Sequence, residues 1–411
     1  MRRSPLLSRP DAVANPAGDL DAAVPARYED PLREQNALAA GLAATALARD
    51  VVAVTGPDRL SWLNTLSSQE LTRLTSGDGG AEALLLDAQG HITHALACVD
   101  DGDTLLLVTE AGRGSELAEF LQSMRFMLRV EVSVREDVAV LAALGEGGGA
   151  LEEAARAAGA HLATWHDPWP GVVEGGTSYD VGMERTHPGA GYRATWVLVD
   201  SEAVGQVADA FLAADPGRSL AGTLAWEALR VEAGRPRWGR EADARTIPHE
   251  LDWLRTAVHL NKGCYPGQET VARTLNLGRP PRRLTVLQLD GFTGRMPAPG
   301  AVVRLGERAV GAVTSVVRHV DYGPMALALL RRGVPADAPL TVDVAEAEGD
   351  EVAGAAATGA EAEAVARVDA VQEPLVSPEG RAQASPAERP GAGLRRVPLR
   401  RDRWKLRAEF G

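Results

Sequence analysis

The chain has 411 residues, of which 45% are apolar, a formal net charge of −13 and two cysteines. Its length exceeds what one hydrophobic core usually organises, so we expect two or three domains. The acidic balance argues against a general nucleic-acid binder, and two cysteines do not make a disulfide framework. No apolar core of a signal peptide follows Met1, and no apolar run approaches the ~20 residues of a membrane helix. We therefore expect a cytoplasmic protein without membrane contact.

The segment 34–145 has the pattern of an α+β domain. An apolar stripe with the spacing i, i+3, i+4, i+7 predicts an amphipathic helix over 117–124. Runs of β-forming residues bounded by turn residues surround it, and a meander followed by a helix and a strand is an α+β pattern. The predicted strands are 51–55, 83–87, 91–99, 104–109 and 128–134, with a further helical stripe from Leu60 to Leu74.

The segment 146–282 predicts a second α+β region. The glycine run 145–149 is expected to break the chain before it. The sequence WEALRVEAG reads as a helix stopped by Gly234 and Pro236. The other predicted elements are helices at 152–158 and 204–212 and a strand at 194–199.

The C-terminal part has a different pattern of residues from the two regions before it. Short β-like runs separated by Gly and Pro predict a small β-barrel over 283–345. Residues 346–363 are rich in Ala, Glu and Gly and are expected to form a flexible insertion, after which 364–376 reads as a returning strand.

The two ends of the chain lack a clear hydrophobic period. Residues 1–33 are expected to form a flexible arm that docks, if anywhere, near Tyr28 to Leu32, and 377–411 a disordered tail. The tail is basic between Arg395 and Arg407. The tail either serves only to keep the protein soluble, or it contacts RNA or an acidic partner. We expect no other part of the chain to bind nucleic acid.

The segment NKGCYPGQETVAR, residues 261–273, is chemically unusual for this chain. Apart from Lys405, Lys262 is the only lysine, and it stands two residues before Cys264. Pro266 and Gly267 fit positions i+1 and i+2 of a type II turn, which would leave the sulfur reachable. A nearby cation lowers a thiol pKa, so Lys262 or Arg273 would favour the thiolate. Chance retention of the lysine is the alternative.

Cysteine roles differ along the chain. Cys98 alternates with Ile92 and Leu96 on one face of a strand, which indicates a buried structural residue. For Cys264, the adjacent turn favours a functional role over a structural one. One cysteine cannot hold an iron–sulfur cluster alone, and no CxxC or HExxH spacing occurs, so we expect no permanently bound metal. After the turn, Thr270, Val271 and Thr274 favour an extended segment.

The motif Lys262-Gly263-Cys264-Tyr265-Pro266-Gly267-Gln268-Glu269 resembles the K-G-C-Y-x-G-Q-E signature of the YgfZ family, which is related to the glycine-cleavage aminomethyltransferase T-protein. Three further stretches support the resemblance, and together they span roughly residues 49–344. They are VTGPDRLSWLNTLSSQEL from Val54, LRVEAGRPRWGRE from Leu229 and IPHELDWLRTAVHL from Ile247.

The resemblance implies a ring of three domains around a tetrahydrofolate channel, with 34–145 as the first part of the folate-binding domain. It also implies a role in iron–sulfur cluster assembly or repair in client enzymes, including tRNA-modifying ones. The family cysteine falls on Cys264. The folate-contacting tryptophan falls on Trp226, which could equally anchor its helix, and Arg230 could face the folate carboxylates or only solvent.

One departure from the aminomethyltransferases concerns catalysis. Their Gly pair is followed by an Asp pair that assists one-carbon transfer, whereas this chain has Gly90-His91-Ile92-Thr93-His94-Ala95. His94 either lines the channel or is a satisfied core histidine. The favoured interpretation is a folate-dependent accessory protein with a reactive Cys264. The alternatives are a one-carbon transferase lacking the usual Asp and a binding scaffold with a relic channel, so enzymatic activity stays open.

Overall fold

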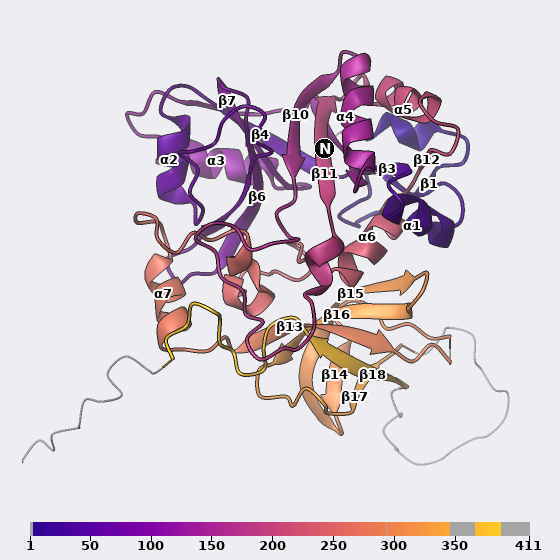
Figure 1. Ribbon diagram of the computed structural model, residues 1–411, viewed down its shortest axis with the longest axis vertical. Helices are drawn as coiled ribbons and strands as arrows, with labels where there is room; N and C mark the ends of the chain where they lie inside the picture. Colours follow the sequence, from indigo (N-terminus) through magenta and orange to yellow (C-terminus); the bar gives the residue numbers. More distant parts are fainter. Residues whose placement is uncertain (1–2, 293, 346–365, 388–411) are drawn as a thin grey trace, which may run out of the picture.

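The computed structural model describes residues 3–292, 294–345 and 366–387. Two five-stranded sheets and a closed barrel form its framework (Figure 1). This confirms the expected α+β class and the C-terminal barrel. In the described part of the chain, no helix combines the length and apolarity needed to cross a bilayer.

The first sheet is antiparallel, in the order β5-β6-β7-β4-β8. Two helices cover its outer face, where Trp62, Leu63 and Leu117 pack against strand residues including Cys98. The elements are β4 (Arg49–Thr55), α2 (Arg59–Leu66), β5 (Ala81–Leu86), β6 (Ile92–Asp100), β7 (Thr104–Glu110), α3 (Gly114–Met124) and β8 (Glu131–Val134).

The second sheet has the order β10-β11-β9-β3-β12, in which only the β3–β12 pair is parallel. Helices α4 and α5 cover its outer face, with Leu151, Val207 and Phe211 in one apolar cluster. The elements are β3 (Ala43–Leu47), β9 (Val138–Leu144), α4 (Gly147–Ala157), β10 (His161–His166), β11 (Ala194–Asp200), α5 (Val204–Ala213) and β12 (Ser219–Leu220).

The inner faces of the two sheets contribute to one shared core. Ala53, Ala97 and Val108 of the first sheet belong to the same buried cluster as Val140 and Trp165 of the second. Because β3 and β9 both join the second sheet, the boundary expected at residue 145 does not coincide with the division between the sheets. The glycines after 145 begin α4 rather than breaking the chain.

A set of short elements fills the junction between the sheets and the barrel. Helix α6 contacts α1 and the barrel strand β15, so it ties these layers together (Figure 1). The elements are α1 (Pro31–Ala39), η2 (Pro188–Gly191), α6 (Thr223–Glu232), η3 (Pro248–Leu251), η4 (Trp253–Arg255) and α7 (Gln268–Asn276).

The barrel closes in the order β13-β16-β15-β14-β17-β18. Its returning strand β18 pairs with both β13 and β17 and so completes the closure, while the expected flexible insertion lies within 346–365, outside the described residues. The strands are β13 (Arg282–Leu289), β14 (Val302–Leu305), β15 (Arg308–His319), β16 (Gly323–Arg331), β17 (Leu340–Asp343) and β18 (Arg367–Pro374).

The expectation of a flexible arm over 1–33 is wrong for the residues described. η1 (Pro5–Ser8), β1 (Val13–Ala14) and β2 (Pro25–Arg27) form there, and α1 begins at Pro31. Leu6 is buried against the second sheet's outer cluster, and Asp21 is buried in ion pairs with Arg237. The sequence does not indicate this docking, because the residues that anchor the segment are isolated and follow no hydrophobic period.

The expectation of a disordered tail is wrong for residues 377–387. Ser377 donates from its backbone to Tyr179, Gln383 donates in the same way to Ser178, and Ala382 is buried. The basic cluster from Arg395 to Arg407 lies outside the described residues.

Candidate functional site

The turn that carries Cys264 has the predicted geometry. Gly267 has a φ of 79°, and the amide of Gln268 donates to the carbonyl of Tyr265 at 3.3 Å, as in a type II turn. Cys264 is exposed, whereas Tyr265 beside it is buried. Burial raises the pKa of Tyr265 to about 12. The thiol is therefore reachable from solvent on a turn whose conformation requires glycine.

The segment after the turn differs from the expected extended strand. It is the helix α7, in which Val271 and Leu275 are buried at the i, i+4 spacing while Glu269 and Arg273 are exposed. Packing on one apolar face thus overrides the β propensity of Thr270, Val271 and Thr274.

Two glycines allow the turn to lie against the first sheet. A Cβ on Gly267 would lie 2.7 Å from the carbonyl oxygen of Asp87 and 3.0 Å from Cα of Gly90. Gly90 has a φ of 83°, and a Cβ there would lie 3.0 Å from the Thr270 side chain. The β5–β6 turn and the start of α7 therefore meet at close backbone approach. By contrast, a Cβ on Gly263 would meet no atom within 4 Å.

Lys262 has a different role from the one that the sequence suggests. Its Nζ donates to the carbonyl oxygens of Asn64, Ser67 and Gln69, at and just beyond the end of α2, and lies 5.4 Å from the ring centroid of Tyr265. A cation at a helix C-terminus offsets the partial negative charge there. Burial lowers the pKa of Lys262 to about 8. Within the described ranges, all the hydrogen bonds of the Lys262 Nζ go to backbone carbonyl oxygens. Lys262 therefore has a structural role.

A cavity of about 60 Å³ lies where the two sheets and α6 meet. Trp226 is 2% exposed and packs edge to face against Tyr192, with ring centroids 6.0 Å apart. On strand β6, the small side chains of Ala95 and Ala97 line the cavity and leave it open. The aromatic residues that line the cavity are Trp165, Tyr192, Trp196, Trp226, Trp238 and Trp253.

Charged groups line the same cavity, and most of their bonds are internal. Arg235 donates to Glu82 at 2.6 Å and to Asp167 at 2.9 Å, while Glu82 also accepts from Trp253 Nε1 at 2.8 Å. Burial raises the pKa of Asp167 to about 6, against the opposing effect of Arg235. Two buried donors, Nη1 of Arg235 and Nε1 of Trp196, have no hydrogen-bond partner among the residues that the structure describes. Such donors are rare in folded proteins, so they indicate a ligand or water in the cavity.

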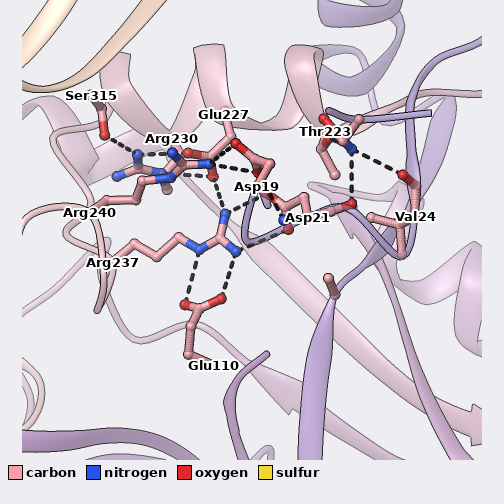
Figure 2. A network of polar contacts seen from close by, with 12 residues as sticks. Asp19, Asp21, Val24, Glu110, Thr223, Glu227, Arg230, Arg237, Arg240 and Ser315 are labelled. Carbon is pink, nitrogen blue, oxygen red and sulfur yellow. Dashed lines mark hydrogen bonds and ion pairs between the residues drawn. The ribbon is translucent and has the colours of Figure 1, made fainter. Parts of the chain in front are cut away.

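Arg230 does not face the cavity as a free guanidinium. Figure 2 shows it inside an ionic network, where it pairs with Glu227 at 2.8 Å and with Glu241 at 2.9 Å and donates to Ser315 of the barrel. Its side chain is 3% exposed. It is therefore neither a ready partner for folate carboxylates nor a solvated charge. Its position links α6 to the barrel strand β15.

Arg237 extends this network to the N-terminal segment. Its two terminal nitrogens pair with Asp21 at 2.7 Å and Glu110 at 2.6 Å, and the group is buried (Figure 2). Sequence reasoning missed Arg235, Arg237 and Glu82 as parts of the site. The alternation of arginines in "GRPRWGRE" after the helix α6 was an available signal.

His94 lies on the opposite face of the first sheet from the cavity. A register shift between Leu85 and Leu86 accommodates Thr93 as an extra residue in β6. Ile92 therefore belongs to the inner core, whereas Leu96 and Cys98 belong to the outer one. His94 Nε2 lies 4.0 Å from Glu116 of α3, and burial, followed by Arg113, lowers the pKa of His94 to about 4. Its expected position in the channel is wrong, and Ala95 lines the cavity instead.

Comparisons with known proteins agree with this architecture. A family model described as CAF17, C-terminal beta-barrel domain, matches residues 282–355. The crystal structure of the glycine cleavage system aminomethyltransferase T from Bartonella henselae covers 92% of this chain and 97% of that one, with a TM-score of 0.64 and 18% identity. That likeness shows the fold.

Two relatives named tRNA-modifying protein YgfZ match most of the chain. The one from Cronobacter sakazakii is 28% identical over 281 residues, which is 65% of this chain and 78% of the relative. The one from Edwardsiella ictaluri is 26% identical over 296 residues, or 70% and 84%. These matches support the resemblance to the YgfZ family. The chain combines an aminomethyltransferase-like fold with a barrel that matches the CAF17 C-terminal domain and with the cysteine motif.

Proposed function

We propose that this protein is a tetrahydrofolate-binding accessory factor for the assembly or repair of iron–sulfur clusters in enzymes, including those that modify tRNA. The observation that carries the proposal is the tryptophan-lined cavity with two unpartnered donors, in a protein whose exposed Cys264 sits on a constrained turn. Two relatives carry the name tRNA-modifying protein, which supports a role in tRNA modification.

The cavity chemistry fits a flat heteroaromatic ring. The indole of Trp226 lines the cavity and offers a ring for stacking, whereas the Trp196 ring already packs against Trp165 and Arg49. The unpartnered donors on Arg235 and Trp196 match acceptor atoms on a ring edge. The open space of about 60 Å³ holds about four waters at roughly 15 Å³ each, so a bicyclic ring enters only when lining side chains move apart. Trp238 is half-buried at the lining and is the side chain that we expect to move. A bound folate would supply a one-carbon carrier there.

Cys264 supplies the reactive group in this proposal. Its exposure allows a client protein to reach the sulfur. In the described parts of the chain, no group of three or more His, Cys, Asp and Glu side chains is arranged to hold a metal ion. We therefore assign transient chemistry on a client's cluster or thiol to Cys264.

One-carbon transfer is the alternative function, and few groups in the cavity support it. The strand β6 presents Ala95 and Ala97 there in place of a carboxylate. The carboxylates of Glu82 and Asp167 already accept hydrogen bonds from Arg235. Formation of methylene-tetrahydrofolate or formaldehyde by the purified protein would favour the alternative.

Folate binding is tested by titrating the full chain with 5-formyltetrahydrofolate, using calorimetry and tryptophan fluorescence. Trp196→Phe keeps a ring but removes the free Nε1 donor, so we expect affinity to fall roughly threefold to tenfold. Trp62→Phe is the matched control, because Trp62 is buried in the outer core of the first sheet. Absence of binding, or an equal loss in both variants, would refute the proposal.

A further inference from the structure

The tryptophan-lined cavity approaches solvent at few of its side chains. Most of the residues that line it are buried, and the half-buried ones are Arg49, Ala95, Trp196 and Trp238. Arg49 lies over the Trp196 ring at 5.2 Å and pairs with Glu110 at 3.1 Å, so an ion pair holds this side. Trp238 lies instead beside the start of β6, the strand that carries Ala95. The side formed by Trp238 and Ala95 is therefore where the cavity opens most readily.

The hydrogen bond of the Trp238 indole is weak. Its Nε1 donates to the carbonyl oxygen of Ile92 at 3.4 Å, which is longer than the roughly 2.7–3.2 Å that is usual for an N–H···O bond. Trp253 Nε1, by comparison, donates to the buried carboxylate of Glu82 at 2.8 Å. The residue after Trp238 is the exposed Gly239, with a φ of 80°, and glycine changes its backbone angles at low cost. Trp238 can thus turn without breaking a strong contact of its indole nitrogen.

Arg113, just before α3, covers the ring of Trp238. Its Cζ lies 4.0 Å from the ring centroid, and a cation over the face of an indole is attracted by the ring quadrupole. The guanidinium is fixed in turn, because it donates to the carbonyl oxygen of Thr93 at 2.9 Å and pairs with Glu116 at 2.7 Å. Arg113 is not among the residues that line the cavity. It therefore acts on the cavity through Trp238, which makes it a positioning residue.

We propose that Trp238 and Arg113 form a gate on this cavity. Trp238 turns outward to admit the ligand, and stacking of Arg113 on its ring favours the closed position both before and after binding. A movement of this kind is required, because an open space of about 60 Å³ does not admit a bicyclic ring. The gate rests on the proposed function for the identity of the ligand, whereas the movement of Trp238 follows from its own contacts. Arg113 thereby sets the rate of ligand exchange rather than the affinity.

The movement is measured first without ligand. Fluorine NMR of the full chain labelled with fluorotryptophan, with Trp238→Phe to assign the resonance, reports exchange of the Trp238 ring on the microsecond-to-millisecond timescale. We expect Arg113→Met to increase the open population roughly twofold to fivefold, the effect of one exposed cation–π contact, and Arg113→Lys to keep it near the wild-type value. Arg218→Met is the matched control, because Arg218 stacks on Phe211 of α5 at 4.8 Å, outside the cavity lining. A Trp238 resonance that shows no exchange, or that responds equally to the control, would overturn the gate.

The second readout is the kinetics of 5-formyltetrahydrofolate binding, followed by stopped-flow tryptophan fluorescence. Arg113→Met should raise the association and dissociation rate constants together, each roughly twofold to fivefold, while Kd stays within about twofold of the wild type. Slower association, or rate constants that do not change, would contradict the gate. If Trp238 exchanges as expected but neither the wild type nor Arg113→Met binds folate, the proposed function fails and the gate stays supported.

Discussion

The ammonium nitrogen of Lys262 lies 2.7 Å from the carbonyl oxygen of Ser67, the residue that caps the C-terminal end of α2. The same nitrogen binds the carbonyls of Asn64 and Gln69. Lysine suits this place because a compact ammonium directs three donors at converging oxygens, which a planar guanidinium cannot do. The rare lysine of the motif therefore anchors the Cys264 segment to the C-terminal end of α2.

Replacing Lys262 by Met should destabilise the protein by about 2–3 kcal/mol, because it leaves buried carbonyl oxygens unpaired. Lys262→Arg should recover only part of this loss. Urea unfolding measures the change, and the rate of Cys264 modification by a disulfide reagent gives the second readout. A variant with normal stability but a slower thiol reaction would show instead that the charge acts on the sulfur.

Gly267→Ala should cost about 1–3 kcal/mol, because an L residue is strained at a φ of 79° and its Cβ would meet the carbonyl of Asp87. Gly263→Ala is the matched control four residues earlier, where a Cβ meets open space, and its effect should stay within about 0.5 kcal/mol. Thermal or urea unfolding of both variants compares them directly. Equal effects would contradict the assigned turn geometry.

Arg230→Met should destabilise the fold by about 3–5 kcal/mol, because it leaves Glu227 and Glu241 as buried, partly unpaired carboxylates. The exposed pair of Arg129 and Asp58 provides the control, since Arg129→Met should have a much smaller effect on stability. A stable Arg230→Met protein with weakened folate affinity would instead support direct contact between this arginine and the ligand.

His249 predicts a pH effect at the base of α7. It is fully buried, Nε2 lies 3.0 Å from the carbonyl of Val271, and burial lowers its pKa to about 4. A depressed histidine pKa contributes stability that is present above the unfolded value near 6.5 and is lost as pH falls towards 4.

The His249→Asn variant isolates this contribution from the other titrating groups. The stability difference between wild type and variant should shrink by about 2 kcal/mol between pH 7 and pH 5, because each pH unit in this window is worth about 1.4 kcal/mol. Urea unfolding at both pH values measures it. A difference that does not change with pH would mean that the imidazole titrates alike in both states.

Regular periodicity made the framework predictable from sequence. The strands β4 to β7, the stripe of α3 and the barrel strands all follow their apolar patterns, and Pro266-Gly267 specifies the turn. The sequence did not predict α7, because Thr and Val have β propensity and only tertiary burial of Val271 and Leu275 decides the helix.

The site was less predictable because it depends on contacts distant in sequence. The extra residue at Thr93 turns His94 away from the cavity, and no local signal marks that bulge. Likewise, Arg230 and Arg237 meet carboxylates from the N-terminal segment, the first sheet and the loop after α6 only once the chain is folded. A single charged residue in a sequence does not indicate which distant residue it will pair with.

The most direct measurement is complementation in cells that lack their own YgfZ-family protein, with the activity of an iron–sulfur-dependent tRNA-modifying enzyme as the readout. The cells would receive wild type, Cys264→Ser or Cys98→Ala at equal expression, Cys98 being the buried control. We predict that wild type and Cys98→Ala restore tRNA modification and that Cys264→Ser does not. Full restoration by Cys264→Ser would contradict the reactive-thiol account.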